Sequence, residues 1–177
     1  MFLMTHHRLL VFAAAVPLLA QNPVTDALKN SYSRMKQNLI ETAEVMPESD
    51  YGFKLTPQQR AFGQWLGHTA MGNYNFCAAI RGATPPEAMK SIEGLSSKAD
   101  LSKALKDSFD YCDEAVNALT DQKATTQIAV GDRKAYPVTT YVSLVASLNE
   151  HYGNLVGYLR SKGIVPPSTA RAARSKK

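Results

Sequence analysis

Four long segments in which apolar residues recur every three or four positions constrain the fold of this chain more than any other feature. That spacing is the period of an amphipathic helix with one apolar face turned toward a core. The predicted helices cover residues 28–46, 57–81, 98–119 and 137–162. Their lengths are typical of a helical bundle, and no alternating pattern predicts a ladder of strands. The sequence therefore predicts an all-α four-helix bundle.

Cap and turn residues mark where these helices begin and end. Before the second helix, Thr56 stands at the cap position, Pro57 in the first turn, and Gln59 where a capping box places its glutamine. The third helix is expected to begin at Ser97. The fourth is expected to end at Gly163, because glycine is common directly after a helix.

A long connection joins the second and third helices. Residues 82–97 read GATPPEAMKSIEGLSS, and the cap-like residues 84–87 predict a short extra helix there. A connection of this length is able to carry the chain across the bundle, so the second and third helices need not form a hairpin. Residues 120–136 are polar and contain glycine, which predicts a loop with a brief extended piece near residues 125–130.

The first twenty residues have the three-part layout of a secretory signal peptide. A short start with His6, His7 and Arg8 precedes an apolar run that ends at Ala20. The run is shorter than the roughly 20 apolar residues of a spanning helix, so no stable membrane span is expected after cleavage. An uncleaved N-terminal helix is the alternative. We expect residues 1–20 to be removed and the mature protein to be periplasmic or secreted.

The net charge of +5 does not predict nucleic-acid binding once the charges are located. Residues 165–177 hold four of the basic groups, and residues 21–164 contain fifteen basic and fifteen acidic side chains. Phosphate binding needs basic side chains clustered on a folded face, whereas this excess lies in a segment rich in Pro, Ser and Ala. We therefore expect a neutral domain at residues 21–164, a basic flexible tail at residues 165–177, and no nucleic acid among the partners.

Only two histidines follow residue 20, and both fall inside predicted helices. At about 100° per residue, His151 lies within the apolar stripe of the fourth helix, and His68 lies at the margin of the stripe of the second. Two histidines directed into one bundle are able to share a metal. The alternative is that they are hydrogen-bonded residues of the core.

A family resemblance rests on two strings, FGQWLGHTAMGNYNF in the second helix and HYGNLVGYLR, followed by GIVPP, in the fourth. Together they resemble the DinB-like (DinB/YfiT-like) superfamily over most of residues 24–167. The resemblance implies a four-helix bundle of the DinB/YfiT type, with the long connection between helices 2 and 3. Better-known members bind a divalent metal, and some are thiol-dependent transferases or isomerases. A metal such as Zn or Ni and a small-molecule thiol or other substrate are therefore implied.

The resemblance also implies a set of metal ligands, which this chain matches only in part. The family typically uses three histidines, one on the second helix and two, four residues apart, on the fourth. His68 matches the first and His151 the later of the pair, but the earlier position holds Ser147. A neutral hydroxyl is a poor ligand for zinc or nickel. The candidate replacements, none of which restores a face of three nitrogens, are Asn73, Asn75, Asn154 and Glu150.

These residues leave two functions open. The first, which we favour, is an exported DinB-like bundle of uncharacterised activity with a reduced or degenerate divalent-metal site. The second is a metal-dependent enzyme of the thiol-transferase or isomerase type, in which His68 and His151 are metal ligands around an open site. No other cofactor is expected, and a homodimer is compatible with either function.

Cys77 and Cys112 are the only cysteines of the chain. In an exported protein an even pair of cysteines predicts a disulfide bond. The alternative is two buried free thiols that pack as small apolar side chains. We expect a disulfide bond between Cys77 and Cys112, which closes a loop of about 35 residues.

Overall fold

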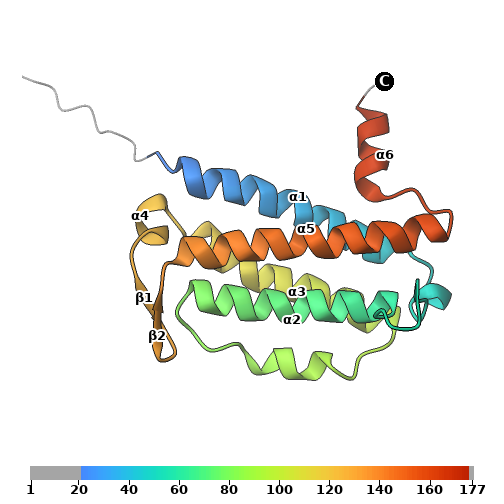
Figure 1. The fold of residues 1–177 in the computed structure, drawn as a ribbon, viewed down its shortest axis with the longest axis horizontal. Helices are drawn as coiled ribbons and strands as arrows, with labels where there is room; N and C mark the ends of the chain where they lie inside the picture. The colour runs from blue at the N-terminus through green and yellow to red at the C-terminus, as the bar shows by residue number, and fades with distance from the viewer. Residues whose placement is uncertain (1–20, 176–177) are drawn as a thin grey trace, which may run out of the picture.

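The computed structural model describes residues 21–175, so the predicted signal peptide at residues 1–20 lies outside the described part of the chain. Four long helices form the body of the protein (Figure 1). They are α1 (Pro23–Val45), α2 (Phe62–Ile80), α3 (Lys98–Asn117) and α5 (Pro137–Ser161). The all-α four-helix bundle predicted from the sequence is confirmed.

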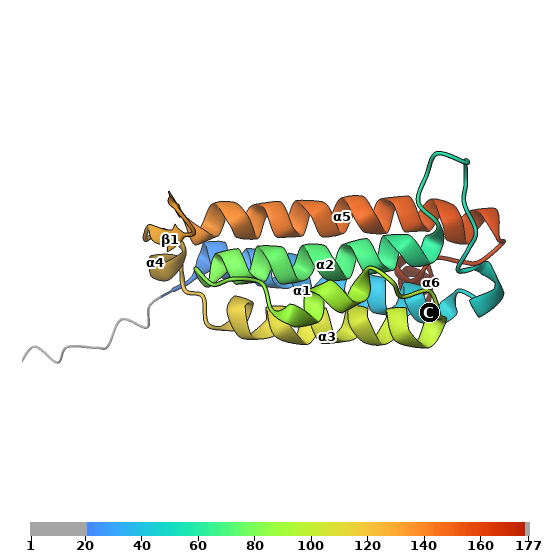
Figure 2. The same cartoon turned by 90° about the horizontal axis from the view of Figure 1, so that it is seen from below.

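The long helices run in two pairs of opposite direction. Helices α1 and α5 run one way along the bundle, and α2 and α3 run the other way (Figure 1, Figure 2). The first turns of α2 and α3 approach closely, since a methyl group on Gly63 would lie 2.9 Å from Cδ1 of Leu101. Helices α2 and α3 are therefore parallel neighbours, which a short hairpin loop cannot join.

The connection between α2 and α3 returns the chain from one end of the bundle to the other. It contains the short 3-10 helix η2 (Glu87–Ile92), which runs alongside α2 (Figure 1). Ile92 is buried and attaches this connection to the core. The extra helix expected after residues 84–87 is therefore present, although it is a 3-10 helix.

Most of the predicted helix ends agree with the structure. The side chain of Ser97 caps α3 and accepts a hydrogen bond of 3.1 Å from the backbone N–H of Asp100. Beyond α5, Gly163 has a φ of 72°, a left-handed conformation that glycine adopts without strain. Both ends were predicted from local signals, and local bonds produce them.

The predicted start of the second helix at Thr56 is wrong. Residues 56–59 form a turn instead, closed by a bond of 3.1 Å from the N–H of Gln59 to the carbonyl oxygen of Thr56. The helix starts at Phe62, whose N–H donates to the carbonyl oxygen of Phe53 at 2.9 Å. The N–H of Gly63 donates in the same way to Tyr51 at 2.8 Å. These two bonds hold the start of α2 against the segment that follows the 3-10 helix η1 (Glu48–Asp50), and the local cap signal did not predict them.

A small hairpin closes one end of the bundle. After the one-turn helix α4 (Asp121–Ala124), strand β1 (Ile128–Val130) pairs antiparallel with β2 (Arg133–Ala135). Gly131, with a φ of 58°, makes the turn between them. The extended piece was predicted, but its pairing with residues 133–135 was not.

The flexible tail predicted for residues 165–177 is wrong for most of its length. Helix α6 (Pro167–Arg174) begins with two buried prolines and packs beside α1. The guanidinium of Arg171 bonds to Glu41 and Asn38 on α1. The hydroxyl of Tyr152 on α5 donates to Ser168 Oγ at 2.7 Å. A proline in the first turn and three alanines favour this helix, so the segment's composition was misread as disorder.

The core lies between the four long helices and is rich in aromatic rings. The ring of Tyr32 meets two others edge to face, with centroid distances of 6.0 Å to Phe109 and 6.5 Å to Tyr141. Phe62 and Tyr158 fill the opposite end of the core and are fully buried. Within residues 21–175, no helix has the length and hydrophobicity that crossing a membrane requires.

Candidate functional site

His68 on α2 and His151 on α5 lie side by side between the two helices. Their ring centroids are 5.0 Å apart, and the ring planes are inclined by 52°. The indole of Trp65, one turn before His68, contacts both rings, with centroid distances of 5.9 Å to His68 and 5.4 Å to His151. His151 is 6% exposed, whereas His68 is half-buried. The structure therefore brings together His151, which the sequence placed within an apolar stripe, and His68, which the sequence placed at the margin of one.

Thr69 decides which nitrogen of His151 carries the proton. The Thr69 hydroxyl donates to the carbonyl oxygen of Trp65 at 2.8 Å, and its oxygen lies 3.1 Å from Nδ1 of His151. Because a hydroxyl has one proton, this oxygen is the acceptor in the second bond and the imidazole is the donor. The proton is therefore on Nδ1, and the lone pair of the neutral ring is on Nε2.

Ser147 faces that lone pair. Its hydroxyl oxygen lies 3.4 Å from Nε2 of His151, one turn away on α5. The contact is long for a hydrogen bond from a hydroxyl, but Ser147 is the donor that the tautomer requires. Both ring nitrogens of His151 therefore have partners within the protein. Ser147, one of these partners, occupies the position where the resemblance implies a third histidine.

Both imidazoles are neutral at pH 7. Burial, followed by the neighbouring His68 ring, lowers the pKa of His151 from 6.5 to about 4. Burial, followed by the Arg60 guanidinium, lowers the pKa of His68. The Glu150 carboxylate opposes both shifts but does not reverse them.

A chain of contacts fixes the indole beside the histidines. The Arg60 guanidinium lies over the indole of Trp65, 5.2 Å from its centroid. The indole N–H donates to the Tyr158 hydroxyl at 3.2 Å, and this hydroxyl donates to the backbone carbonyl oxygen of Arg60. The site therefore has a rigid aromatic wall, with a permanent positive charge beside the two neutral rings.

His68 also lines a cavity of about 330 Å³ between the start of α2 and the connection that contains η2. Arg60 and Glu93 bring opposite charges to this cavity, and Gln64 adds an amide. His151 is buried, contacts the His68 ring and is not among the lining residues. A molecule in the cavity would meet the His68 ring, and His151 would support that ring from the core.

The family assignment agrees with this arrangement. The family model described as the DinB superfamily matches residues 31–154, a range that contains both histidines and Ser147. This chain belongs to the DinB superfamily. The crystal structure of a DinB-like protein from Bacillus cereus ATCC 10987 is similar to it, with a TM-score of 0.67 and 16% identity over 80% of this chain and 95% of that chain. No curated protein matches the chain. A likeness at this identity concerns the fold, so the chemistry of this DinB bundle has to come from its own residues.

Of the four candidate replacements for the third ligand, two are hydrogen-bonded elsewhere and two are exposed. The amide of Asn73 donates to Ser108 on α3 at 3.0 Å, and the amide of Asn154 donates to the backbone carbonyl oxygen of Glu150 at 3.0 Å. Asn75 and Glu150 are exposed. Among residues 21–175, no three His, Cys, Asp or Glu side chains are grouped so that they would hold a metal ion. Two imidazoles and a hydroxyl therefore do not fit the three-histidine centre that the resemblance implies.

The two cysteines lie on the other side of α2. The structure pairs Cys77 with Cys112 of α3 at disulfide distance, with 5.2 Å between the Cα atoms. Both side chains are fully buried, so this pair belongs to the packing of α2 on α3.

Sequence reasoning missed Thr69 and Arg60 as parts of the site. Thr69 had a signal, since it is a polar residue inside an apolar stripe and follows His68 directly. Arg60 had none, because a helix predicted from residue 57 places it in a first turn. In the structure it precedes the helix and folds over Trp65.

Proposed function

We propose that this DinB-superfamily protein is an exported small-molecule-binding bundle with a reduced histidine centre, which works without a resident metal. The observation that carries the proposal is the pairing of both nitrogens of His151. Nδ1 donates to Thr69, and Ser147 occupies the direction of the Nε2 lone pair. A metal on His151 would have to displace the Ser147 hydroxyl and would gain only His68 as a second protein nitrogen.

The local charge also disfavours a cation bound at His68. Arg60 is close enough to lower the pKa of both histidines, so the same positive field acts on any cation placed between them. At His68 the effect of Arg60 exceeds that of the Glu150 carboxylate, whereas at His151 the carboxylate has the larger effect of the two. The pair is better suited to hydrogen bonding with a neutral or anionic group than to holding Zn²⁺ or Ni²⁺.

The cavity in front of His68 indicates the class of ligand. Arg60 is suited to a carboxylate and Glu93 to an ammonium group, and the neutral ring of His68 lies between polar and apolar lining residues. We expect a small zwitterionic molecule, with a thiol or hydroxyl group directed at His68. Its binding is measured by NMR titration of the His68 ring with L-cysteine and with L-serine. Arg60→Gln and Glu93→Gln should each weaken the binding of both compounds.

Export is the second part of the proposal. It is supported by the three-part layout of residues 1–20 and by a cysteine pair at disulfide distance, which is typical of oxidising compartments. N-terminal sequencing of protein recovered from the periplasm or the medium should begin near Gln21. A retained Met1 would contradict the proposed cleavage.

A second function is favoured by the 5.0 Å spacing of two neutral imidazoles. In that case His68 and His151 would hold a divalent metal, which would supply the Lewis-acid chemistry of a thiol-transferase or isomerase. The first function predicts substoichiometric metal in protein purified without chelator and no rise of Tm with added Zn²⁺ or Ni²⁺. A stoichiometric metal that His151→Ala removes would support the second function instead.

A further inference from the structure

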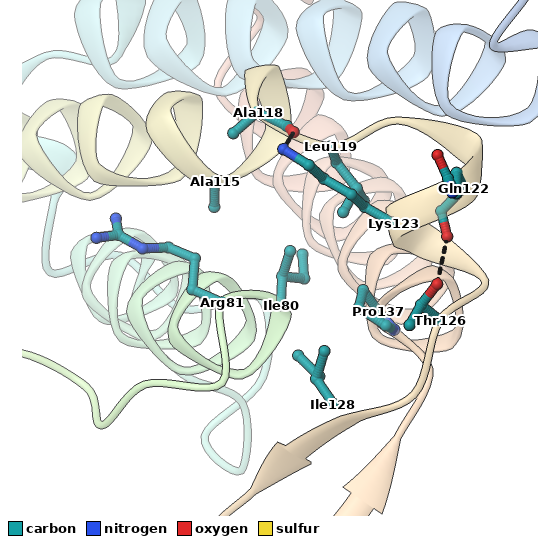
Figure 3. A pocket seen from close by; sticks show the side chains of 10 residues that line it. All are labelled: Ile80, Arg81, Ala115, Ala118, Leu119, Gln122, Lys123, Thr126, Ile128 and Pro137. Atoms are coloured by element: carbon teal, nitrogen blue, oxygen red, sulfur yellow. Dashed lines mark hydrogen bonds between the residues drawn. The ribbon is translucent and has the colours of Figure 1, made fainter. Parts of the chain in front are cut away.

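A second cavity, of about 430 Å³, lies at the end of the bundle far from the histidines. It opens where α2 and α3 end and α5 begins, next to α4 and the β1–β2 hairpin (Figure 3). Along α2 alone, His68 and Ile80 are about 18 Å apart at the rise of about 1.5 Å per residue. The cavity is therefore separate from the proposed function described above.

The lining of this cavity is divided into an apolar floor and a polar rim. Ile80, Leu119, Ile128 and Pro137 contribute carbon surface, and Figure 3 shows Ile80 and Ile128 directed toward the same space. The volume is within the range of small-molecule sites, roughly 300–1,000 Å³, and an apolar floor with a few polar groups is their usual composition.

The charged residues of the rim have one sign. Arg81 and Lys123 line the cavity, and no carboxylate is among the described residues that line it. Arg81 pairs with Glu114 at 3.1 Å and stacks on Tyr111, but the Arg81 and Glu114 side chains are 39% and 73% exposed. An ion pair so exposed to water contributes little, so an anion in the cavity would have to replace only this pair and the contact with Tyr111 to draw the guanidinium inward.

The last carbonyl groups of the two helices that end at this cavity already have hydrogen-bond partners. The ammonium group of Lys123 bonds to the carbonyl oxygen of Ala118 at the end of α3 at 3.1 Å. The carbonyl oxygen of Ala78 at the end of α2 is met by the N–H of Ala83 at 2.9 Å. Helix α5 begins at Pro137 on the wall of the cavity, so the positive end of a 25-residue helix faces the same space.

We propose that this cavity binds a small amphiphilic carboxylate. Its apolar body would pack on Ile80, Leu119 and Ile128, and its carboxylate would lie between Arg81 and Lys123. Both cations are required by this assignment, because the apolar floor alone accepts a neutral molecule of the same shape.

Octanoate and 1-octanol are the probes for this site, since they share a chain and differ in charge. Methyl NMR of the full mature chain should show octanoate shifting Ile80 and Ile128. Arg81→Gln or Lys123→Gln should weaken octanoate binding at least tenfold and leave 1-octanol unchanged. Lys103→Gln is the matched control, because Lys103 is an exposed lysine that pairs with Asp107 elsewhere on α3.

Thr126→Trp tests the location on a folded protein, since Thr126 is an exposed residue of the rim. It should abolish the shifts of Ile80 and Ile128 with both probes. The proposal is overturned by the absence of octanoate binding at millimolar concentration. Octanoate binding that neither charge variant weakens would also overturn it. So would shifts that are confined to the His68 ring.

Discussion

Helix α2 has two seams of buried polar residues, and they differ in what their groups are able to do. On the α3 side, Asn73 bonds to Ser108 and Cys77 pairs with Cys112, so the polar groups bridge the helices and carry no charge. On the α5 side, His151 is bonded in the core, but His68 faces a cavity. The difference shows that burial alone does not identify a site. A titratable group that reaches both the core and a cavity is the stronger candidate.

The α2–α3 seam should give the largest effect on stability. Replacing Cys77 and Cys112 together with Ala should lower the free energy of unfolding by about 3–4 kcal/mol, because it reopens a loop of 35 residues in the unfolded chain. Urea unfolding of the double variant measures this. Wild type in which the disulfide bond is reduced should have the same free energy of unfolding as the double variant. Two titratable thiols in denatured, unreduced wild type would contradict the bond.

The α2–α5 seam should make stability depend on pH. The folded protein binds a proton on His151 with a pKa of about 4, below the 6.5 of the unfolded chain, so the unfolded state takes up more protons between these values. Stability should therefore fall as the pH decreases from 6.5 to 4, by up to about 3 kcal/mol.

His151→Leu is the variant that tests this pH dependence. Urea unfolding at several pH values should show a flatter profile in His151→Leu. His68→Gln should flatten the profile less, because His68 is the more exposed of the two. An unchanged profile in His151→Leu would contradict the buried, neutral ring.

The bond between Thr69 and His151 should have the next largest effect. Thr69→Val keeps the shape but leaves the Nδ1 proton of His151 without an acceptor, which should cost about 1–3 kcal/mol. Thr69→Ser keeps the hydroxyl and serves as the control, so its loss should be smaller. Equal losses in the two variants would assign the effect to packing.

The smallest effect should come from the contact of α6 with α1. Arg171→Gln removes the ion pair with Glu41 and should cost about 0.5–1 kcal/mol. Arg174→Gln is the control on the exposed face of the same helix and should change nothing measurable. Urea unfolding measures the free energy of unfolding of both variants. A larger loss in Arg174→Gln would contradict the packing of α6.

Local sequence signals predicted what local bonds decide, and they failed where distant residues decide. The cap at Ser97 and the glycine after α5 were predicted correctly, because their partners are within a few residues. The start of α2 was not, since Phe53 and Tyr51 hold it from outside the helix. The apolar stripe directed His151 inward, but its bond to Thr69 depends on how α5 packs against α2. That packing is not encoded in either helix alone.

The central claim is that His151 holds its proton on Nδ1 and leaves no metal-binding face toward Ser147. The most direct measurement is long-range ¹H–¹⁵N NMR of the imidazoles during a Zn²⁺ titration, with Ser147→His as the comparison. Wild type should show a neutral His151 ring protonated on Nδ1 and unchanged by one equivalent of Zn²⁺. Ser147→His, which supplies the third nitrogen, should shift Nε2 of His151 at that same equivalent. A stoichiometric shift of Nε2 in wild type would contradict the account.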